Sequence, residues 1–241
     1  MPRFFVDSVA EDTLLLTGQN GIHVRRSLRM GPGDPLTVCD GRGTDAACRI
    51  EGFRGDEVLL TVLSRTPTAT EPSCAVTLYQ GLPKGDKMEW IIQKAVELGV
   101  SRIVPVQMAR SVSVITDKPD KRDKKAARWQ KIADEAAGQS GRGILPPVEA
   151  PVSFREAAAR LAEENTLICY EGGGAPLWEL ADRTAGAVSL VIGPEGGIDR
   201  KELSLMCENG GRPVTLGPRI LRCETAPLAA LAVLMAATGN M

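Results

Sequence analysis

The sequence is poor in the side chains on which most metal sites and nucleophilic enzymes depend. Its 241 residues include one histidine, His23, and six cysteines that lie far apart without a C-x-x-C pair. Zinc sites draw on clustered cysteine and histidine ligands, so we expect no metal. A serine or cysteine nucleophile is also disfavoured, because each usually needs a positioned imidazole.

Long apolar runs and an excess of one charge are also missing. The most apolar stretch, Ala226 to Ala237, is shorter than the roughly 20 residues that a membrane helix requires. The opening MPRFFVDSV lacks the apolar core of a signal peptide, and the cysteines show no disulfide pattern. We therefore expect a cytoplasmic protein with no membrane partner.

Charge is distributed unevenly even though the net charge is only −1. Residues 71–145 carry 13 lysines and arginines against 9 acidic residues, which predicts a local site for a polyanion. The densest basic run is Lys118–Lys131, and we favour phosphate contacts for it over a merely solvated helix face. Aromatic residues make up 4% of the chain, which argues against a broad platform for stacked bases.

The common nucleotide and hydrolase motifs are absent. There is no G-x-x-x-x-G-K-[ST] loop, and no G-x-G-x-x-G follows a predicted strand. The segment Gly138–Arg142 (GQSGR) lacks the last glycine of a G-x-S-x-G nucleophile elbow. The sequence therefore indicates neither a P-loop enzyme, nor a conventional dinucleotide enzyme, nor a serine hydrolase.

Turn residues and hydrophobic patterns divide the chain into two parts. Short β-branched runs at Leu36–Cys39, Ala46–Ile50 and Glu57–Leu63 predict a small β-barrel or sandwich. The segment Ser64–Ser73 (SRTPTATEPS) has the composition of a linker. We therefore place the first domain at residues 1–70 and the second at residues 71–241.

The second part alternates strand-like and helix-like segments, which is typical of an α/β domain with a parallel sheet. Its predicted strands are Ala75–Gln80, Arg102–Val106, Thr166–Tyr170, Val188–Ile192 and Pro213–Leu216. Its predicted helices begin near Asp86, Ser153, Asp199 and Thr225, and the first three have a glutamate placed for a capping box. The last helix, Ala226–Ala237, is apolar almost all round, which predicts burial that includes a second subunit.

Two glycine-containing turns follow predicted strands. Gly193–Gly197 (GPEGG) and Leu216–Thr225 (LGPRILRCET) each separate a strand from a helix. Glycine lets a ligand approach the backbone closely, and loops at the carboxyl ends of neighbouring parallel strands form ligand crevices. A plain connection is the alternative for the first turn. The second turn also places two arginines and a glutamate beside Ile220 and Leu221, which favours a binding site.

GPEGG followed by LGPRILRCETA resembles the signature of the knotted, SPOUT-type methyltransferases. More narrowly, the chain resembles the ribosomal RNA small subunit methyltransferase E family. The resemblance includes the opening MPRFFVD, the segment HVRRSLRMGPGD, the block that begins GLPKGDKMEW and the segment RWQKIADEAAGQSGRGILPPV. It covers nearly the whole chain.

This resemblance implies an enzyme that transfers a methyl group from S-adenosyl-L-methionine to N3 of a uridine in 16S rRNA of the small ribosomal subunit. The first domain would be a PUA-like β-barrel that docks RNA. The second would be a SPOUT α/β domain with a deep trefoil knot, and the knot and cofactor site would occupy about residues 166–241. Two such domains would pair as a homodimer. Two alternatives remain: a related enzyme that methylates a tRNA ribose 2′-hydroxyl, and a non-catalytic RNA-binding assembly factor.

The resemblance and the chemistry of the two turns together imply a set of site residues. Arg222, Arg219 and Glu224 are the catalytic candidates, since an arginine can stabilise the anion that forms when N3 loses its proton. Glu195 is a second candidate for the proton acceptor. The expected cofactor-binding residues are Ile192, Gly193, Glu195, Gly196, Leu216, Gly217, Ile220, Leu221, Arg222, Glu224 and Thr225. The expected RNA-binding residues are Arg3, Arg25, Arg29, Lys84, Lys87, Arg110, Gln139, Ser140 and Arg142. His23, Trp90 and Trp129 are expected to have structural roles.

Overall fold

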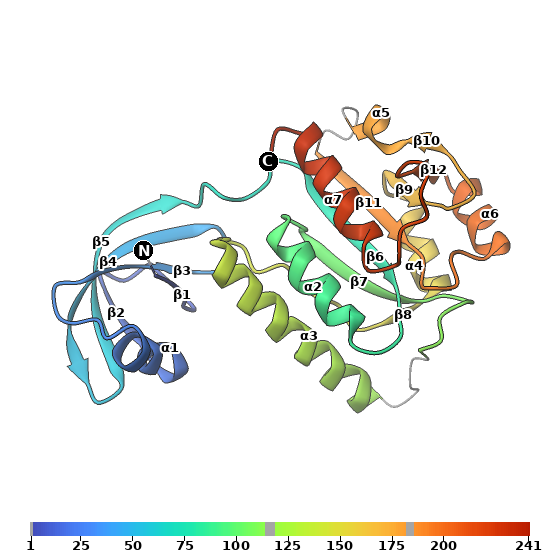
Figure 1. Cartoon of the computed structure of the whole chain (residues 1–241). Coiled ribbons are helices and arrows are strands. Elements are labelled where there is room, and N and C mark those ends of the chain that lie inside the picture. Colours follow the sequence, from blue (N-terminus) through green and yellow to red (C-terminus); the bar gives the residue numbers. More distant parts are fainter. Residues whose placement is uncertain (1, 114–118, 182–185) are drawn as a thin grey trace. The chain divides into compact units, whose positions relative to one another are not determined.

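In the computed structural model, which describes residues 2–113, 119–181 and 186–241, a β-rich unit comes first in the chain. One five-stranded sheet with the order β1-β3-β4-β5-β2 dominates this unit, and β1 runs parallel to β3 while the other pairs are antiparallel (Figure 1). The elements are β1 (Arg3–Phe5), β2 (Thr13–Leu16), α1 (Gly18–Ile22), the π-helical turn η1 (His23–Ser27), β3 (Pro35–Cys39), β4 (Thr44–Arg54) and β5 (Glu57–Pro67).

The core of the first unit follows from alternation along its strands. Successive side chains of a strand point to opposite faces, and β4 buries Ala46, Cys48 and Ile50 while the residues between them are more exposed. These side chains pack with Leu36, Val38, Val58 and Leu60 from the neighbouring strands. The expected β-sheet core of the first domain is therefore confirmed, although α1 and η1 add helical turns to the expected all-β pattern.

The borders of the first unit differ from the prediction in two ways. Strand β5 continues to Pro67, so the predicted linker Ser64–Ser73 begins inside a strand. Residues 137–145 also belong to the first unit, together with residues up to Glu71. Glu71 explains this grouping: its carboxylate accepts hydrogen bonds from the backbone N–H groups of Gly143 (2.8 Å) and Ile144 (3.1 Å) and pairs with Arg142. Such long-range polar contacts leave no signal in the hydrophobic pattern.

A seven-stranded parallel sheet with the order β10-β12-β9-β11-β6-β7-β8 forms the centre of the second unit (Figure 1). Contacts place α2 and α7 on the same side of this sheet, whereas α4 and α6 pack together on the other. The strands are β6 (Ala75–Gly81), β7 (Arg102–Gln107), β8 (Val152–Ser153), β9 (Thr166–Cys169), β10 (Ala175–Pro176), β11 (Ala187–Ile192) and β12 (Arg212–Thr215). The helices are α2 (Lys87–Glu97), α3 (Pro119–Ser140), α4 (Phe154–Leu161), α5 (Leu177–Ala181), α6 (Arg200–Glu208) and α7 (Ala226–Ala237).

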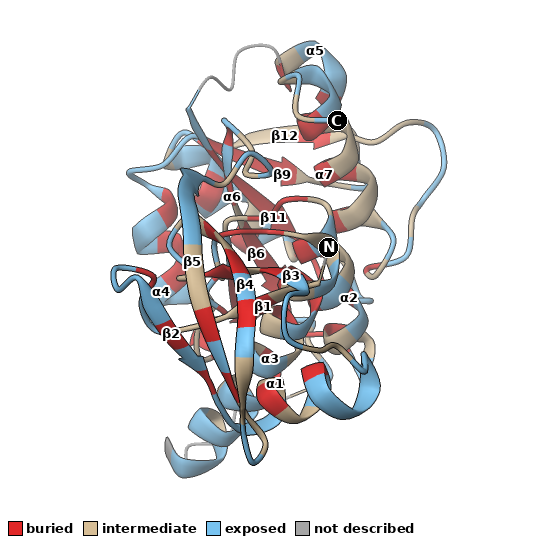
Figure 2. Ribbon diagram, turned by 90° about the vertical axis from the view of Figure 1, so that its left-hand side faces the viewer, coloured by how far each residue is buried: buried red, intermediate tan, exposed pale blue. Residues whose placement is uncertain are grey.

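The central strands of this sheet are buried almost continuously, as expected for parallel strands with helices on both faces. In β11 every residue from Val188 to Ile192 is buried, and Figure 2 shows β6, β9 and β11 mostly in the colour of buried residues. Every strand predicted in this part of the chain is present, within one or two residues at its ends. The predicted α/β domain with a parallel sheet is confirmed.

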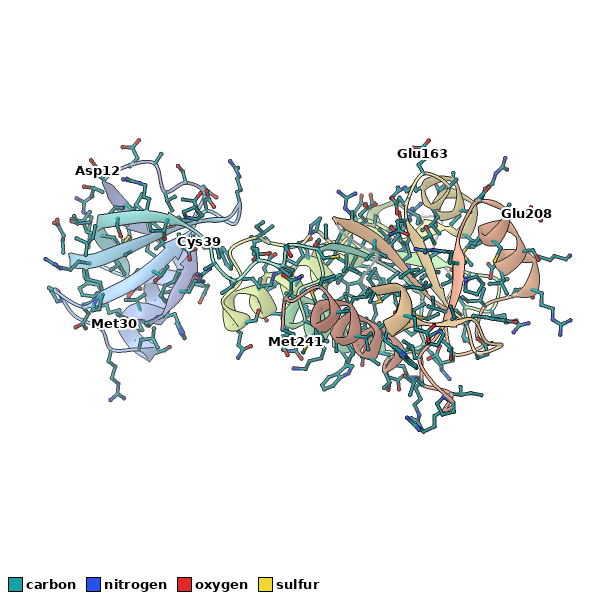
Figure 3. All side chains as sticks on the ribbon, turned by 90° about the horizontal axis from the view of Figure 1, so that it is seen from above. Asp12, Met30, Cys39, Glu163, Glu208 and Met241 are labelled. Carbon is teal, nitrogen blue, oxygen red and sulfur yellow. The ribbon has the colours of Figure 1, made fainter. Side chains whose placement is uncertain are left out.

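Helix ends follow the predicted capping in two cases out of three. Ser153 with Glu156 and Asp199 with Glu202 form complete capping boxes at the starts of α4 and α6. The side chain of Asp86 makes no such bond at the start of α2: its backbone is not extended, and the N–H of Glu89 donates to the Asp86 carbonyl at 3.0 Å. The expected stops at Gly99 and Gly210 have positive φ angles, which glycine adopts without strain. Figure 3 labels Glu208, the last residue of α6 before this stop.

Candidate functional site

A cavity of about 550 Å³ lies at the carboxyl ends of three neighbouring strands, β9, β11 and β12. Its walls are the segments that follow them: Cys169–Glu171 after β9, Ile192–Gly197 after β11 and Val214–Glu224 after β12. Lys87 and Ala226 complete the lining. Parallel strands place their carboxyl ends at one edge of the sheet, so three loops distant in sequence meet here. The volume falls in the range of small-molecule sites.

The two glycine turns form most of this cavity, as predicted. It is lined by ten of the eleven residues proposed for the cofactor: Ile192, Gly193, Glu195, Gly196, Leu216, Gly217, Ile220, Leu221, Arg222 and Glu224. Thr225 lies outside the lining and is exposed at the start of α7. Arg219, the second catalytic candidate, also lines the cavity. The arrangement supports a binding role for the two turns.

The first turn is tightly packed around its glycines. A Cβ atom on Gly193 would lie 2.9 Å from the Ile198 side chain, and one on Gly197 would lie 2.3 Å from the carboxylate of Glu171. A Cβ on Gly196 would lie 2.9 Å from Cβ of Arg110, and the guanidinium of Arg110 donates to the Gly196 carbonyl at 3.0 Å. A larger residue at position 196 would therefore first displace Arg110, and only through it the turn.

Lys87 connects the two turns. Its ammonium lies 3.0 Å from a carboxylate oxygen of Glu195 and 3.1 Å from one of Glu224. The backbone N–H of Lys84 donates to the carboxylate of Glu195 as well (3.1 Å). One cation on α2 thus holds one acidic residue from each of the loops that follow β11 and β12.

This pairing controls the protonation of all three groups. Hydrogen bonds that the Lys87 ammonium donates to the two carboxylates raise its pKa, and the bond to Glu195 has the largest effect. Partial burial raises the pKa of Glu195 and of Glu224, but hydrogen bonds from the backbone and from Lys87 outweigh it and leave both below their ordinary value. Both carboxylates therefore stay ionised at neutral pH and are weaker bases than an ordinary glutamate.

The two cysteines of the cavity are protonated. Burial raises the pKa of Cys169 and of Cys223 to about 12 in each case. The Cys223 thiol donates to Glu224 at 3.2 Å. Since the thiolate is the nucleophilic form, neither sulfur is suited to attack a substrate at neutral pH.

Both arginines of the second turn are exposed at the rim of the cavity. Ile220 stands beside them with 84% of its surface exposed, so the chain itself does not cover it. The Arg222 carbonyl accepts hydrogen bonds from the N–H groups of Thr225 (2.8 Å) and Ala226 (2.9 Å), which fixes the backbone beneath its side chain. A fixed backbone with a solvent-facing guanidinium suits contact with an anionic ligand at the mouth of the cavity.

Seven lining residues lie outside the residues and turns predicted for the site: Lys87, Cys169, Tyr170, Glu171, Val214, Thr215 and Ala226. Cys169 ends β9, which was predicted as a strand of the same sheet, and Tyr170 and Glu171 directly follow it. The rule for strand ends predicts a third loop at that place, although it contains none of the conspicuous glycine–arginine pattern. Lys87 was expected at the RNA, and only the folded arrangement shows its two carboxylate partners.

Two of the predicted RNA-binding residues are held in ion pairs within the first unit. Arg142 is 4% exposed and its guanidinium pairs with Glu71 at 2.7 Å. Arg3 is largely buried, forms an ion pair with Asp45 and donates to the Arg142 carbonyl at 2.9 Å. Their charges are engaged inside the first unit, so the expectation of RNA contacts is corrected for both: each holds together segments distant in sequence.

The other predicted RNA contacts have mixed surroundings. Arg25 donates to the Gly55 carbonyl and lies over the ring of Phe53 at 5.6 Å. Arg110 is bound to the first glycine turn, as described above. Exposed side chains are found at Arg29, Lys84 and Gln139, and Ser140 is half-buried, with its hydroxyl donating to Ala137 at 3.4 Å.

The three residues expected to have structural roles differ in their exposure. Trp129 is 2% exposed and belongs to the core, whereas Trp90 is 52% exposed beneath the ammonium of Lys94. His23 is exposed and its ring meets the ring of Phe4 edge-on at 6.0 Å between centroids. The described residues contain no cluster that could hold a metal ion, and none of the described helices is long and apolar enough to cross a membrane.

Comparison with known proteins defines the class of this fold and site. Residues 70–235 match the model of the RNA methyltransferase domain, and residues 16–63 match that of the RNA methyltransferase PUA domain. The chain is an RNA methyltransferase in which an α/β unit with a cavity follows a β-rich RNA methyltransferase PUA domain.

The relatives narrow this class. A ribosomal RNA small subunit methyltransferase E from Bacillus subtilis is 38% identical over 97% of this chain and 96% of the relative, and one from Mycobacterium bovis is 33% identical over 95% and 88%. A crystal structure of this enzyme from Neisseria gonorrhoeae, bound to S-adenosylmethionine, is 34% identical and superposes with a TM-score of 0.87 over 98% of this chain and 97% of that one. The chain belongs to the ribosomal RNA small subunit methyltransferase E family.

Proposed function

We propose that this protein transfers a methyl group from S-adenosylmethionine to N3 of a uridine in 16S rRNA of the small ribosomal subunit, in the cytoplasm. The observation that carries the proposal is the cavity at the ends of β9, β11 and β12, with two exposed arginines at its mouth. The names of the relatives and the cofactor bound to one of them support the same reaction.

The lining fits this cofactor chemically. Apolar side chains of Ile192, Leu216 and Leu221 offer walls for an adenine, while the polar backbone of the two glycine turns is placed beside them. Glu171, Glu195 and Glu224 supply carboxylates for ribose hydroxyls and for the positive charges of the methionine part. When bound, S-adenosylmethionine supplies a methyl group already activated on a sulfonium.

The protein must also make N3 of the uridine nucleophilic and align it with the methyl group of the cofactor. N3 carries a weakly acidic proton, and the charge left by its loss spreads over two carbonyl oxygens. Arg222, and second Arg219, would stabilise this anion with N–H donors that stay protonated. The lowered pKa of Glu195 and Glu224 favours a positioning role through Lys87 over acceptance of the N3 proton.

Incubation of the protein with methyl-labelled S-adenosylmethionine and bacterial ribosomal RNA tests this function. Label is expected in the small-subunit RNA and not in tRNA. Label in tRNA would favour a related enzyme with another RNA target. Cofactor binding without any transfer to RNA would favour a non-catalytic assembly factor.

Lys87→Ala is expected to weaken the binding of S-adenosylmethionine roughly tenfold, the combined size of two accessible ion pairs. The two turns would lose their shared cation, and their carboxylates would repel each other across the cavity. Calorimetry on the variant measures this change. Lys87→Arg should restore most of the affinity. Lys84→Ala is the matched control, since Lys84 contributes only its backbone N–H to Glu195. If the Lys87→Ala and Lys84→Ala variants bind S-adenosylmethionine with equal affinity, the ion pairs of Lys87 do not support the cofactor site.

We further propose that the protein is a homodimer and that residues 166–241 carry the trefoil knot of the SPOUT methyltransferases. Helix α7 supports the dimer: it buries Leu231, Leu234 and Met235 within its own unit, while Ala229, Ala232 and Val233 on its other side are only half-buried. A second apolar face on a helix calls for a partner. Sedimentation of dilute protein should give twice the 25.7 kDa of one chain, and a species of 25.7 kDa alone would refute the dimer.

A further inference from the structure

One face of α3 gathers the positive charge that the sequence concentrates in its middle third. Lys121, Lys124, Lys125, Arg128 and Lys131 are all exposed, and at helical spacing they fall within an arc of about 120°. They extend over about 15 Å of helix. We call these five residues the α3 basic face; Lys118, at the start of the basic run, lies outside the described residues.

The buried side of α3 borders this face, since the ammonium of Lys125 lies over the ring of Trp129. Trp129, Ala133 and Ala136 are buried, so this side of the helix is fixed against the protein. Arg122, on the buried side, donates to the carbonyl of Pro151. Figure 1 shows α3 alongside α2, and the ion pair between Arg128 and Glu89 joins the two helices. The basic face therefore has a fixed orientation on the surface of the second unit.

The charge pattern of this face is unfavourable for the helix itself. Lys121 with Lys125 and Lys124 with Arg128 are like-charged pairs four residues apart, which destabilise a helix. Between positions 121 and 131 the only acidic residue, Asp123, lies on the other side of the helix. Within the described part of the chain, Lys121 and Lys124 have no ion-pair partner within 4.0 Å, whereas Arg128 has Glu89 and Lys131 has Glu135. An ordinary solvated helix face intersperses both signs.

We infer that the α3 basic face binds the phosphate backbone of an RNA helix. Four lysines and one arginine on one helix face suit phosphates, which carry charge but no sequence information. Lys125 alone lies over an aromatic ring, that of Trp129 at 4.8 Å. Bases would require stacking side chains, and the only aromatic residue of this segment, Trp129, is buried. The inference rests on the proposed function, because it assigns to this face part of the same ribosomal RNA substrate.

The face lies outside the cavity, so its role is to dock the substrate rather than to choose the nucleotide. None of its five residues lines the cavity, and none forms an ion pair with Glu195 or Glu224, the two partners of Lys87. Neutralising it should therefore lower the affinity for RNA of any sequence and leave cofactor binding unchanged. Chemistry at saturating RNA should also be unchanged.

The test compares two double variants of the full chain. Lys121→Gln/Lys124→Gln removes two cations of the face that have no ion-pair partner among the described residues. Arg155→Gln/Lys201→Gln removes two exposed cations from α4 and α6 and is the matched control. Binding is measured by fluorescence anisotropy over a series of salt concentrations. The probes are a small-subunit rRNA fragment and an unrelated RNA duplex of about 16 base pairs, the span of a duplex-binding domain.

The face variant should bind both probes roughly tenfold more weakly near 0.1 M salt. The slope of its log affinity against log salt concentration should be shallower by roughly 1.5, because a variant that makes two fewer phosphate contacts releases fewer counterions when it binds. The control should match the parent. An unchanged slope in the face variant, in a parent that binds and methylates rRNA, overturns this inference alone. Loss of binding to phosphatidylserine vesicles with RNA binding intact would assign the face to a membrane and also overturn it. A parent that neither binds nor methylates rRNA overturns the proposed function as well.

Discussion

Arg222→Ala is expected to lower the single-turnover rate of RNA methylation at least ~10²-fold, as the loss of one anion-stabilising donor typically does. The guanidinium of Arg222 is exposed at the mouth of the cavity, where the uridine must approach the cofactor. Its backbone carbonyl is fixed by the first turn of α7, so truncation of the side chain should leave the loop in place. Calorimetry should accordingly show S-adenosylmethionine bound within a few-fold of the parent affinity.

Two further variants separate this role from a general charge effect. Arg219→Ala removes the neighbouring rim arginine and should have a smaller effect on the same rate. Arg212→Ala removes an arginine that lines no part of the cavity and donates to Asn165, and it should leave the rate unchanged. If Arg222→Ala methylates RNA within a few-fold of the parent rate, Arg222 has no part in the mechanism.

Glu71→Ala is expected to destabilise the first unit by about 3–5 kcal/mol, the usual effect of removing one partner of a buried ion pair. The guanidinium of Arg142, with 5% of its side chain exposed, would lose its carboxylate partner. The N–H groups of Gly143 and Ile144 would lose their acceptor as well. Hydrogen exchange of the backbone amides in β3, β4 and β5 measures the opening of this unit directly.

The same carboxylate gives the first unit a dependence on pH. Burial alone would raise the pKa of Glu71. The hydrogen bond and the charge of Arg142, together with hydrogen bonds from two backbone N–H groups, lower it by more, so the pKa lies below its ordinary value. A lowered pKa in the folded state stabilises the fold above the unfolded pKa of about 4.3. This contribution should be present at neutral pH and lost as the pH falls through the folded pKa.

Asp12→Ala is the control for both effects. Asp12 also pairs with an arginine, Arg65, at 3.0 Å, but its side chain is 90% exposed. Exposed pairs contribute about 0–1 kcal/mol, so this variant should exchange nearly as the parent does. Equal protection of the β3–β5 amides in Glu71→Ala and in the parent would show that the Glu71–Arg142 pair does not hold the first unit together.

The sequence predicts this fold wherever local pattern determines the outcome. The apolar runs Val188–Ile192 and Arg102–Val106 are strands within a residue or two of the prediction, because buried parallel strands need no partner-specific signal. Elements of two or three residues, such as β1 and β8, exist only through pairing with strands distant in the chain. No local sequence pattern predicts such short strands.

Prediction of the site succeeded for the backbone and was less complete for the side chains. The two turns were found because glycine and arginine beside apolar residues are conspicuous after a strand, and ten of eleven expected residues line one cavity. The ion pairs of Lys87 with Glu195 and Glu224 join positions more than a hundred residues apart, and no rule based on sequence spacing predicts them. Arg142 shows the opposite error: a motif suggested an exposed arginine, and the fold buries it against Glu71.

Nucleoside mass spectrometry of small-subunit rRNA tests the central claim most directly. Unmodified rRNA transcript is incubated with the protein and S-adenosylmethionine, digested to nucleosides and compared with a sample treated with Arg222→Ala for the same time. We expect 3-methyluridine to accumulate with the parent protein and to be nearly absent with the variant. A ribose-methylated nucleoside, or equal amounts of 3-methyluridine with both proteins, would contradict the account.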